Sequence, residues 1–515
     1  MTAKLGSQGK MSTRPIKVNF IINLLSPITR IVVALGTVPL YLHHLGDARY
    51  GVMSIVWVLL GLFGFLDLGL SRAVTNALAK LRDAPQPHRA RVLLTTFGLN
   101  LGIGVLGGAV LYVFGGLLLK HFVSMPDAIS LEVSRSLPWI ACLLPLTLIS
   151  AAGVGALESR ELFLLVNSIQ IVAMTLAQVA PVLAAIFVSP SLTVVIPTAA
   201  VAQGLGAIVI LAVVYRLEGP LSLRAVDWGE ARKLLGYGGW MFATNVVNPG
   251  LASADQLIIG SVMGVAAVPH YAVPMSLVLR SAAVPLAFGR TLFPRMSSLP
   301  GDAAHTLGTR ALATMAYGFA AICAPAIILS TTFFRYWISA DFATFAAPVA
   351  QVLFPGMWMS ALSLVGFTLL QSQGRADVTG KLNLIEFLPF VGIFWSLTLA
   401  FGIVGAAVAW TFRCTVDALA MLWLSGMKRE DFAVIAPPAA LLVVSLVIAR
   451  FLEPSILITF PVAAFVAVAA FVLGYLFSDD WRRLTLAQLS RARTVIGNLT
   501  NRAKPVPPIN TNAQQ

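Results

Sequence analysis

The sequence has few charged residues for its length. Only 11% of its 515 residues are Asp, Glu, Lys or Arg, whereas 58% are hydrophobic and the mean hydropathy is +0.86. In soluble domains, roughly a quarter of all residues are charged. The composition therefore excludes a soluble fold and indicates a chain that lies mainly in a bilayer.

Cysteine is also scarce. The three cysteines, Cys142, Cys323 and Cys414, all lie in apolar segments, and none belongs to a CxxC pair. A disulfide framework and a zinc site are therefore not predicted. We interpret the three thiols as packing residues.

Long apolar runs make up most of the chain. A hydrocarbon core of about 30 Å needs about 20 apolar residues in a helix, and the sequence holds 14 runs of this kind. We predict an all-α polytopic membrane protein with about 14 transmembrane helices. The predicted spans are 18–42, 50–72, 91–119, 134–157, 162–188, 191–215, 236–262, 267–290, 311–333, 345–370, 379–400, 403–426, 432–450 and 455–478.

Lys and Arg are distributed unevenly among the loops. With the N-terminus inside, the cytoplasmic segments hold 27 of the 35 basic residues and the outer segments hold 5. Basic residues concentrate on the cytoplasmic side of membrane proteins, so both termini are predicted to be cytoplasmic. This topology also accounts for the net charge of +14, and no nucleic-acid partner is needed to explain it.

The segments on the predicted outer side are short, and the longest runs from about residue 120 to 134. Membrane polymerases and ligases usually present catalytic residues on a substantial outer loop, so an enzyme of this kind is disfavoured. His43, His44 and Asp47 share one short loop and could be read as metal ligands. We interpret them instead as neighbours of the lipid headgroups, and predict neither a metal nor a cofactor.

Two apolar segments far apart in the chain share a pattern. Internal repeats in a polytopic membrane protein are typical of transporters whose two lobes rock about a central site. An even number of predicted helices separates the repeats, so the two lobes should be parallel. The repeated residues are Phe20, Asn23 and Pro27 with Phe242, Asn245 and Pro249, 222 positions later, and Gly46 and Tyr50 with Gly264 and Tyr271.

The predicted domains follow from this repeat. Two six-helix lobes are expected, at residues 18–216 and 236–426, with an appended pair of helices at 432–478. Arginines among spaced apolar residues after residue 479 indicate a basic amphipathic segment on the cytoplasmic leaflet, followed by a disordered end. The remaining segments are the N-terminal segment 1–17, the inter-lobe linker 217–235 and the cytoplasmic tail 479–515.

Three arginines fall within predicted spans, where a charge costs about 2.5 to 3.5 kcal/mol at a helix centre and must face protein or water. Arg30 and Arg280 have no acid within four residues on their own helices, so a partner must come from another helix or from the cargo. Arg413 lies four residues before Asp417. This pair could be a local salt bridge or could serve the substrate, and the sequence leaves both interpretations open.

Four acids also lie in predicted spans, namely Asp67, Asp255, Glu386 and Asp417. They are candidates for ion pairing or for coupling transport to Na⁺ or H⁺. Asp67 is followed by Arg72 near the cytoplasmic end of its span, and a structural pair between them is an equal alternative.

The matching prolines Pro27 and Pro249 are predicted to kink helices 1 and 7, because each removes a backbone hydrogen bond in mid-span. A broken helix at membrane depth is tolerated where it faces protein or lines a cavity. Asn23 and Asn245, one turn earlier, could contact a polar cargo or join neighbouring helices.

The run VPLYLHHLGDARYGVMSIVWVLLGLFGFLDLGLSRAVTNALAK at residues 38–80 resembles the opening of Wzx-type polysaccharide flippases of the multidrug/oligosaccharidyl-lipid/polysaccharide exporter superfamily. GYGGWMFATNVVNPGLASADQLIIGSVMG at 236–264 is similar to the start of their second lobe, and FGRTLFPRMSSL at 288–299 to the end of its second helix. The likeness spans roughly residues 17–430.

The resemblance implies that the chain turns over an undecaprenyl-pyrophosphate-linked oligosaccharide in the bacterial inner membrane. Arg30, Arg280 and Arg413 would bind the diphosphate by charge-assisted hydrogen bonds, while Asn23 and Asn245 would contact sugar hydroxyls. A polysaccharide polymerase and a chain-length protein are then possible partners, besides membrane lipid. The alternatives are a lipid II flippase and a cation-coupled drug antiporter. Of these two, the drug antiporter should prefer an unpaired acid in helix 1.

Overall fold

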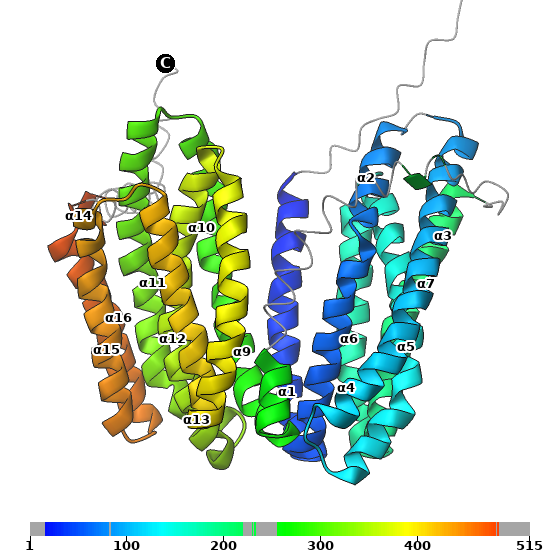
Figure 1. The fold of residues 1–515 in the computed structure, drawn as a ribbon, viewed down its shortest axis with the longest axis horizontal. Coiled ribbons are helices and arrows are strands. Elements are labelled where there is room, and N and C mark those ends of the chain that lie inside the picture. Colours follow the sequence, from blue (N-terminus) through cyan, green and yellow to red (C-terminus); the bar gives the residue numbers. More distant parts are fainter. Residues whose placement is uncertain are drawn as a thin grey trace, which may run out of the picture. The chain divides into compact units, whose positions relative to one another are not determined.

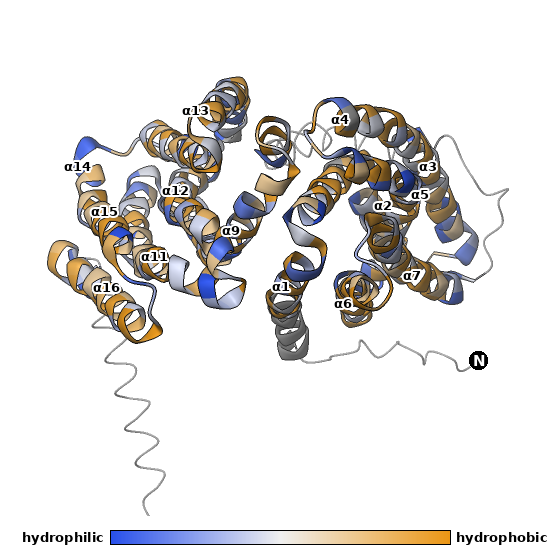
Figure 2. Ribbon diagram, turned by 90° about the horizontal axis from the view of Figure 1, so that it is seen from below, coloured by the Kyte–Doolittle hydropathy of each residue, from blue (hydrophilic) through white to orange (hydrophobic). Residues whose placement is uncertain are grey.

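The computed structural model describes residues 16–81, 84–219, 255–479 and 481–483, together with Gly229, Ala231 and Arg232. Nearly all of these residues are helical and none of them is in a strand (Figure 1). Within the described residues, 11 helical segments are long and apolar enough to cross a membrane. The predicted all-α polytopic membrane fold is confirmed, and Figure 2 shows mostly apolar residues along helices such as α6 and α16.

Helix α1 (Ile16–Phe63) contains the first predicted span, 18–42, and most of the second, 50–72. Its 48 residues would reach about 72 Å if straight, more than twice the thickness of a hydrocarbon core. The backbone leaves the helical region at Gly46, with φ 75° and ψ 167°. Only glycine adopts this conformation readily, so Gly46 divides α1 into two spans.

The same backbone conformation recurs at Gly264, with φ 84° and ψ 164°. Gly264 is the residue that the sequence repeat pairs with Gly46, so the likeness of the two segments extends to their backbone. Helix α13 (Ala376–Leu424) is divided in a similar way at Gly402, with φ 64° and ψ −148°. It contains the predicted span 379–400 and all but the last two residues of the predicted span 403–426.

The predicted span 236–262 falls mostly outside the described residues, so the total of 14 helices remains a prediction.

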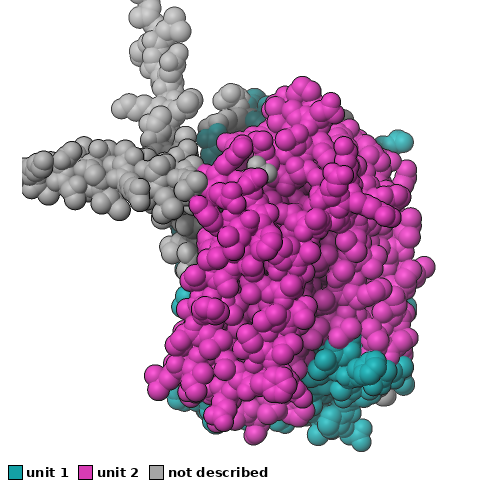
Figure 3. Space-filling model, turned by 90° about the vertical axis from the view of Figure 1, so that its left-hand side faces the viewer, with its two compact units in different colours: residues 1–272, 398–406 teal, residues 273–397, 407–515 magenta. Residues whose placement is uncertain are grey.

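The helices of the chain group into two compact units (Figure 3). Unit 1 comprises residues 1–272 and 398–406, and unit 2 comprises residues 273–397 and 407–515.

Unit 1 is a bundle in which α5 lies against α3 and α7, and α6 lies against α1 and α7 (Figure 1). Apart from α1 itself, these helices are among the elements of unit 1 that follow α1. In chain order they are η1 (Gly64–Asp67), α2 (Leu70–Lys80), α3 (Gln86–Val110), the π-helical η2 (Leu111–Gly115), α4 (Gly116–His121), α5 (Asp127–Glu158), α6 (Phe163–Phe187), α7 (Leu192–Glu218) and η4 (Val265–Ala267).

One expectation about the loops is wrong. Helix α5 begins at Asp127, so the connection expected at about 120–134 spans only the residues between His121 and Asp127. The helix extends past its apolar run because Glu132 accepts two hydrogen bonds from Arg49, at 2.8 and 3.1 Å, and one from the Leu192 backbone NH at 2.8 Å. The polar first turns are thus fixed to α1 and α7.

Unit 2 is organised around α11, which packs against α12, α15 and α16. Helix α16 of the appended pair is joined to α11 by a buried hydrogen bond of 3.0 Å between the hydroxyls of Thr332 and Thr459. Besides most of α13, the elements of unit 2 are α9 (Val268–Ser281), which begins in unit 1, α10 (Ala283–Ser297), α11 (Gly301–Trp337), α12 (Ala340–Ser372), α14 (Arg429–Phe432), η5 (Ala433–Ile435), α15 (Ala436–Phe451) and α16 (Ile456–Phe477).

Candidate functional site

Arg30 lies in the first span, within the part of α1 that precedes Gly46. Its side chain is exposed. No ion pair links Arg30 to another of the described residues. The two acids nearest to it in sequence have other contacts, because Asp47 lies near His270 and Asp67 accepts a hydrogen bond from Ser71. A guanidinium in an apolar span without a local counterion must reach water or an anionic ligand. Asn23 and Pro27 lie within α1, but the side chains of residues 16–28 are outside the described part, and Asn245 and Pro249 lie wholly outside it.

The Asp-Leu-Gly-Leu-Ser-Arg motif forms a break in the second span. After η1, Leu68 (φ 47°) and Gly69 (φ 72°) both take left-handed conformations, and α2 begins at Leu70. Asp67 closes the break, because its carboxylate accepts bonds from the Ser71 hydroxyl at 2.6 Å and from the Ser71 backbone NH at 3.3 Å. Asp67 therefore accepts hydrogen bonds at the start of α2 in the manner of a helix cap, and its side chain also has a hydrogen bond with Asn100.

Helix α2 turns a polar face outward. Leu70, Ala73, Val74 and Leu78 are buried, whereas Arg72 is exposed and shares no salt bridge with any residue in the described ranges. Arg290 on α10 lies 218 positions later, the same offset that separates Gly46 from Gly264, and is also exposed. Sequence reasoning treated both arginines as loop charges. The offset of the two glycines was the signal that could have paired them.

Unit 2 holds a charge cluster between α12 and α13. The Arg413 guanidinium lies 3.9 Å from a Glu386 carboxylate oxygen and 5.1 Å from the centre of the Phe390 ring. Asp417 instead accepts a 2.6 Å hydrogen bond from the Ser363 hydroxyl. Arg413 is thus closest to Glu386, a partner from 27 residues earlier on α13, which the i,i+4 spacing did not reveal.

This cluster carries two carboxylates and one guanidinium, a formal charge of −1 when all are ionised. Both Glu386 carboxylate oxygens and the Asp417 Oδ1 are buried without a hydrogen-bond partner among the described residues. Unsatisfied buried carboxylate oxygens are unfavourable. A proton or a small cation on this cluster would satisfy them.

The remaining predicted charges have different surroundings. Asp255 is 3% exposed, and its Oδ1 accepts a 2.7 Å bond from the Gln256 backbone NH. Arg280 is half-buried in the last turn of α9, directly before the interruption that separates α9 from α10. A helix interruption beside a charge is a feature of transporter binding sites.

His43, His44 and Asp47 were expected in a short loop, but they lie within helix α1. Within the described residues, no group of three His, Cys, Asp or Glu side chains could hold a metal ion. His43 and His44 stack edge to face at 4.9 Å. Asp47 lies 3.6 Å from His270.

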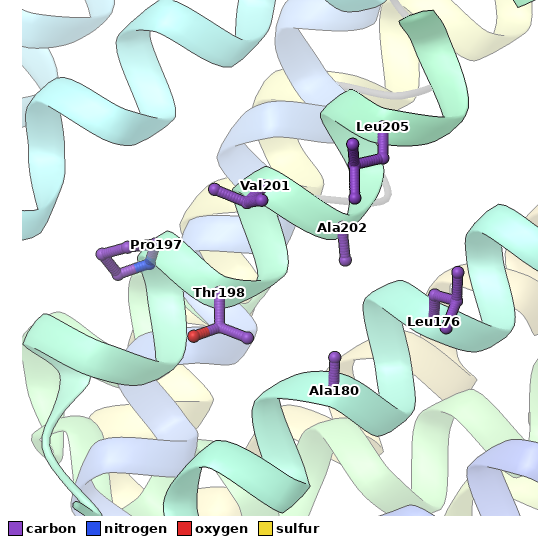
Figure 4. Close-up of a pocket in the computed structure, with 7 residues that line it drawn as sticks. All are labelled: Leu176, Ala180, Pro197, Thr198, Val201, Ala202 and Leu205. Carbon is purple, nitrogen blue, oxygen red and sulfur yellow. The ribbon is translucent and has the colours of Figure 1, made fainter. Parts of the chain in front are cut away.

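A groove on unit 1 lies between α6 and α7 (Figure 4), with a volume of about 360 Å³. Its one lining hydroxyl, that of Thr198, donates to the Val194 carbonyl at 2.7 Å. The groove is therefore apolar and suits a lipid chain rather than a sugar or a phosphate. It is lined by Leu176, Ala180, Pro197, Thr198, Val201, Ala202 and Leu205.

Broken membrane helices, arginines within spans and a buried charge cluster together define a membrane transporter. A family model described as "Polysaccharide biosynthesis protein" matches residues 45–340, more than half of the chain. The chain belongs to this family. The resemblance to polysaccharide flippases predicted from the sequence is thereby confirmed.

A relative from Shigella flexneri, described as "Putative O-antigen transporter", is 25% identical over 414 residues, which are 79% of this chain and 96% of the relative. Two solved structures share the fold at 14% identity. "Lipid II flippase MurJ, inward closed conformation" has a TM-score of 0.64 and covers 91% of this chain and 100% of its own. An inward-facing MATE family transporter of the MOP superfamily has a TM-score of 0.62 and covers 81% and 99%. These relatives are transporters and flippases, not enzymes, as predicted.

Proposed function

We propose that this protein flips an undecaprenyl-pyrophosphate-linked oligosaccharide from the cytoplasmic to the outer face of the bacterial inner membrane. The cargo would be a repeat unit of O-antigen, capsule or exopolysaccharide. Family membership and the O-antigen transporter relative support this cargo class. The observation that carries the proposal is Arg30, an exposed guanidinium in an apolar span that has no salt bridge within the described residues.

Arginines of each unit are candidate ligands of the diphosphate in this proposal. Arg30 and Arg72 belong to unit 1, and Arg280 and Arg290 to unit 2. Guanidinium groups form bidentate hydrogen bonds with phosphate oxygens. Each of these four arginines could therefore take part in binding the diphosphate.

The Arg413, Glu386 and Asp417 cluster is the proposed coupling site. It takes up a proton or Na⁺ when the cargo has left, and this neutral state favours return to the inward-facing form. Arg413 then sets the affinity of Glu386 for the ion and does not contact cargo. Asp67 is proposed as a structural cap.

Two alternatives remain distinct proposals. A lipid II flippase is favoured by the MurJ-like fold, whereas a drug antiporter is favoured by the MATE-like fold and should carry an acid where this chain has Arg30. The topology, with both termini cytoplasmic, is proposed from the charge bias of the loops. An alkaline phosphatase fusion at Gln515 should be inactive in this topology.

Reconstituted vesicles test the function directly. The protein is placed in liposomes with a fluorescently labelled lipid-linked O-antigen unit, with lipid II or with a cationic dye. An impermeant reagent that destroys the label reports how much of each lipid has crossed. Faster crossing of the O-antigen unit supports the proposal, and preferential crossing of lipid II or uptake of the dye assigns the corresponding alternative.

A further inference from the structure

The groove on unit 1 is closed at both ends by contacts between α6 and α7. At one end Gly206 of α7 lies against Ala173 of α6, so closely that a Cβ on Gly206 would clash with the Ala173 methyl group. At the other end α6 stops at Phe187 and α7 begins at Leu192, so only a short turn joins them. The groove lies between these two points and is therefore entered from the side (Figure 4).

Small side chains create the space between the two helices. Ala180 of α6 and Ala202 of α7 point toward each other across the groove (Figure 4). The larger residues Leu176, Val201 and Leu205 are 46%, 48% and 52% exposed and form its rim. Sites that bind small ligands have volumes of about 300 to 1,000 Å³. The volume of this groove, about 360 Å³, lies at the lower end of that range.

The lining of the groove suits only hydrocarbon. Six of the seven lining side chains contain no polar atom. The seventh, Thr198, uses its hydroxyl hydrogen in the bond to the Val194 carbonyl. A polar ligand would lose its hydrogen bonds to water here without replacing them. An apolar chain would instead give the lining atoms contacts that an empty space denies them.

The groove lies at the depth of lipid acyl chains. Both α6 and α7 are candidate membrane spans. In the proposed topology α7 begins at the outer surface with Leu192, and its lining residues 197–205 lie about 8 to 20 Å further along the helix. A hydrocarbon core is about 30 Å thick, so these residues fall mainly in its outer half.

The groove faces away from the helix that carries Arg30. Helix α1 packs against α6, where the Tyr41 hydroxyl donates to the Gln178 carbonyl at 2.8 Å. Gln178 is two residues from both Leu176 and Ala180, which places it about 200° around the helix from them. The groove therefore lies on the opposite side of α6 from α1, where the surrounding bilayer reaches it directly.

We propose that this groove binds one acyl chain of a phospholipid of the outer leaflet. The chain fills the space between α6 and α7 and holds the two helices at their present separation. The occupant follows from the lining of the groove and from its position facing the bilayer, and the leaflet follows from the proposed topology. This binding does not depend on which cargo the protein carries.

Photoreactive phospholipids test the proposal on the full-length protein. Nanodiscs are prepared with phosphatidylethanolamine that carries a diazirine on one acyl chain, either close to the ester or close to the methyl end. After illumination, mass spectrometry maps the labelled residues. Ala180→Phe places a ring in the groove, and Ala109→Phe makes the same change at an exposed alanine of α3 as the matched control.

We expect the groove residues to be labelled severalfold more than the exposed residues of α3. The probe close to the ester should label Ala180 and Pro197, and the probe close to the methyl end should label Leu176 and Leu205, because a chain of the outer leaflet points its methyl end toward the midplane. Ala180→Phe should lower labelling of the groove severalfold, whereas Ala109→Phe should leave it unchanged.

Three results would overturn the proposal. Even labelling of α3, α6 and α7 in the unaltered protein would show that lipid contacts the groove no more than the rest of the surface, and this comparison does not depend on how a variant folds. The reverse order of the two probes would place the chain in the inner leaflet. Loss of groove labelling on addition of undecaprenyl phosphate would assign the groove to a polyisoprenoid chain.

Discussion

Arg89 and Glu218 form a buried ion pair with two hydrogen bonds, of 2.8 and 3.0 Å, between the guanidinium and the carboxylate. Both residues are 4% exposed. Arg89 also donates to the carbonyls of Leu78 and Leu81, each at 3.1 Å, and Arg160 adds a second contact to Glu218 at 2.8 Å. The pair therefore joins α2, α3, α5 and α7 at one end of unit 1.

Arg89→Leu should destabilise the protein by about 3 kcal/mol, because breaking a buried pair leaves an uncompensated charge. The charge of Arg160 can partly compensate that of Glu218, so the loss of stability should lie at the low end of the range for broken buried ion pairs. The double variant Arg89→Leu, Glu218→Leu should be more stable than Arg89→Leu alone. Thermal unfolding in detergent measures this, with Arg216→Leu, an exposed arginine on α7, as the control. A double variant as unstable as the sum of the single ones would contradict the pairing.

The turn at Gly46 gives a prediction that depends only on the backbone. A Cβ at Gly46 would meet nothing within 4 Å, and the same holds for Gly36 in the preceding helix. Gly46→Ala should nevertheless cost about 1 to 3 kcal/mol, since an L residue is strained at a φ of 75°. Gly36→Ala should be neutral or slightly stabilising. Equal effects of the two substitutions on thermal stability would show that the turn adopts another conformation in the membrane.

The sequence was sufficient for the fold class but not for the contacts of its charges. Hydropathy marks each of the 11 candidate membrane spans in the described part of the chain, and the pairing of Gly46 with Gly264 was visible as a repeat. Ion pairs across helices, such as Arg413 with Glu386, depend on helix rotation, which a single sequence does not specify. Arg89 and Arg160 were counted as loop charges because burial at a bundle end leaves no mark in hydropathy. The cap formed by Asp67 on Ser71 was likewise hidden, because the break at Leu68 and Gly69 interrupts the helical spacing.

Arg72 and Arg290, which the offset of 218 residues pairs, should both contribute to export. Arg72→Gln or Arg290→Gln alone should lower glycan export severalfold, because each removes a guanidinium that can bind the diphosphate. The double variant should lower export by more than either single variant. Arg216→Gln is a control with the same loss of charge. The measurement is surface polysaccharide per amount of inserted protein. Normal export by the double variant would show that neither arginine is needed to bind the diphosphate and that both contact lipid headgroups instead.

The charge cluster of unit 2 should determine the response to ion gradients. Glu386→Gln is nearly isosteric and removes the group that pairs with Arg413, so transport in vesicles should continue without acceleration by a pH or Na⁺ gradient. Asp377→Asn on the same helix, an exposed acid paired with Lys381 at 2.9 Å, should keep the acceleration. If Glu386→Gln responds to both gradients as the parent protein does, the cluster has a structural role only.

Arg30 gives the sharpest prediction, because its side chain is exposed in an apolar span and has no salt bridge within the described residues. Arg30→Ala should abolish export while the protein stays inserted and abundant, since no salt bridge seen in the structure is lost. Arg30→Lys should restore only part of the activity, because an ammonium keeps the charge but cannot form the bidentate fork. Thr29→Ala, a neutral change one residue away, is the control for local disturbance. Surface polysaccharide is compared at equal protein abundance. Full export by Arg30→Ala would show that this arginine does not bind the diphosphate, and the cargo anion would then have to be recognised by the other arginines alone.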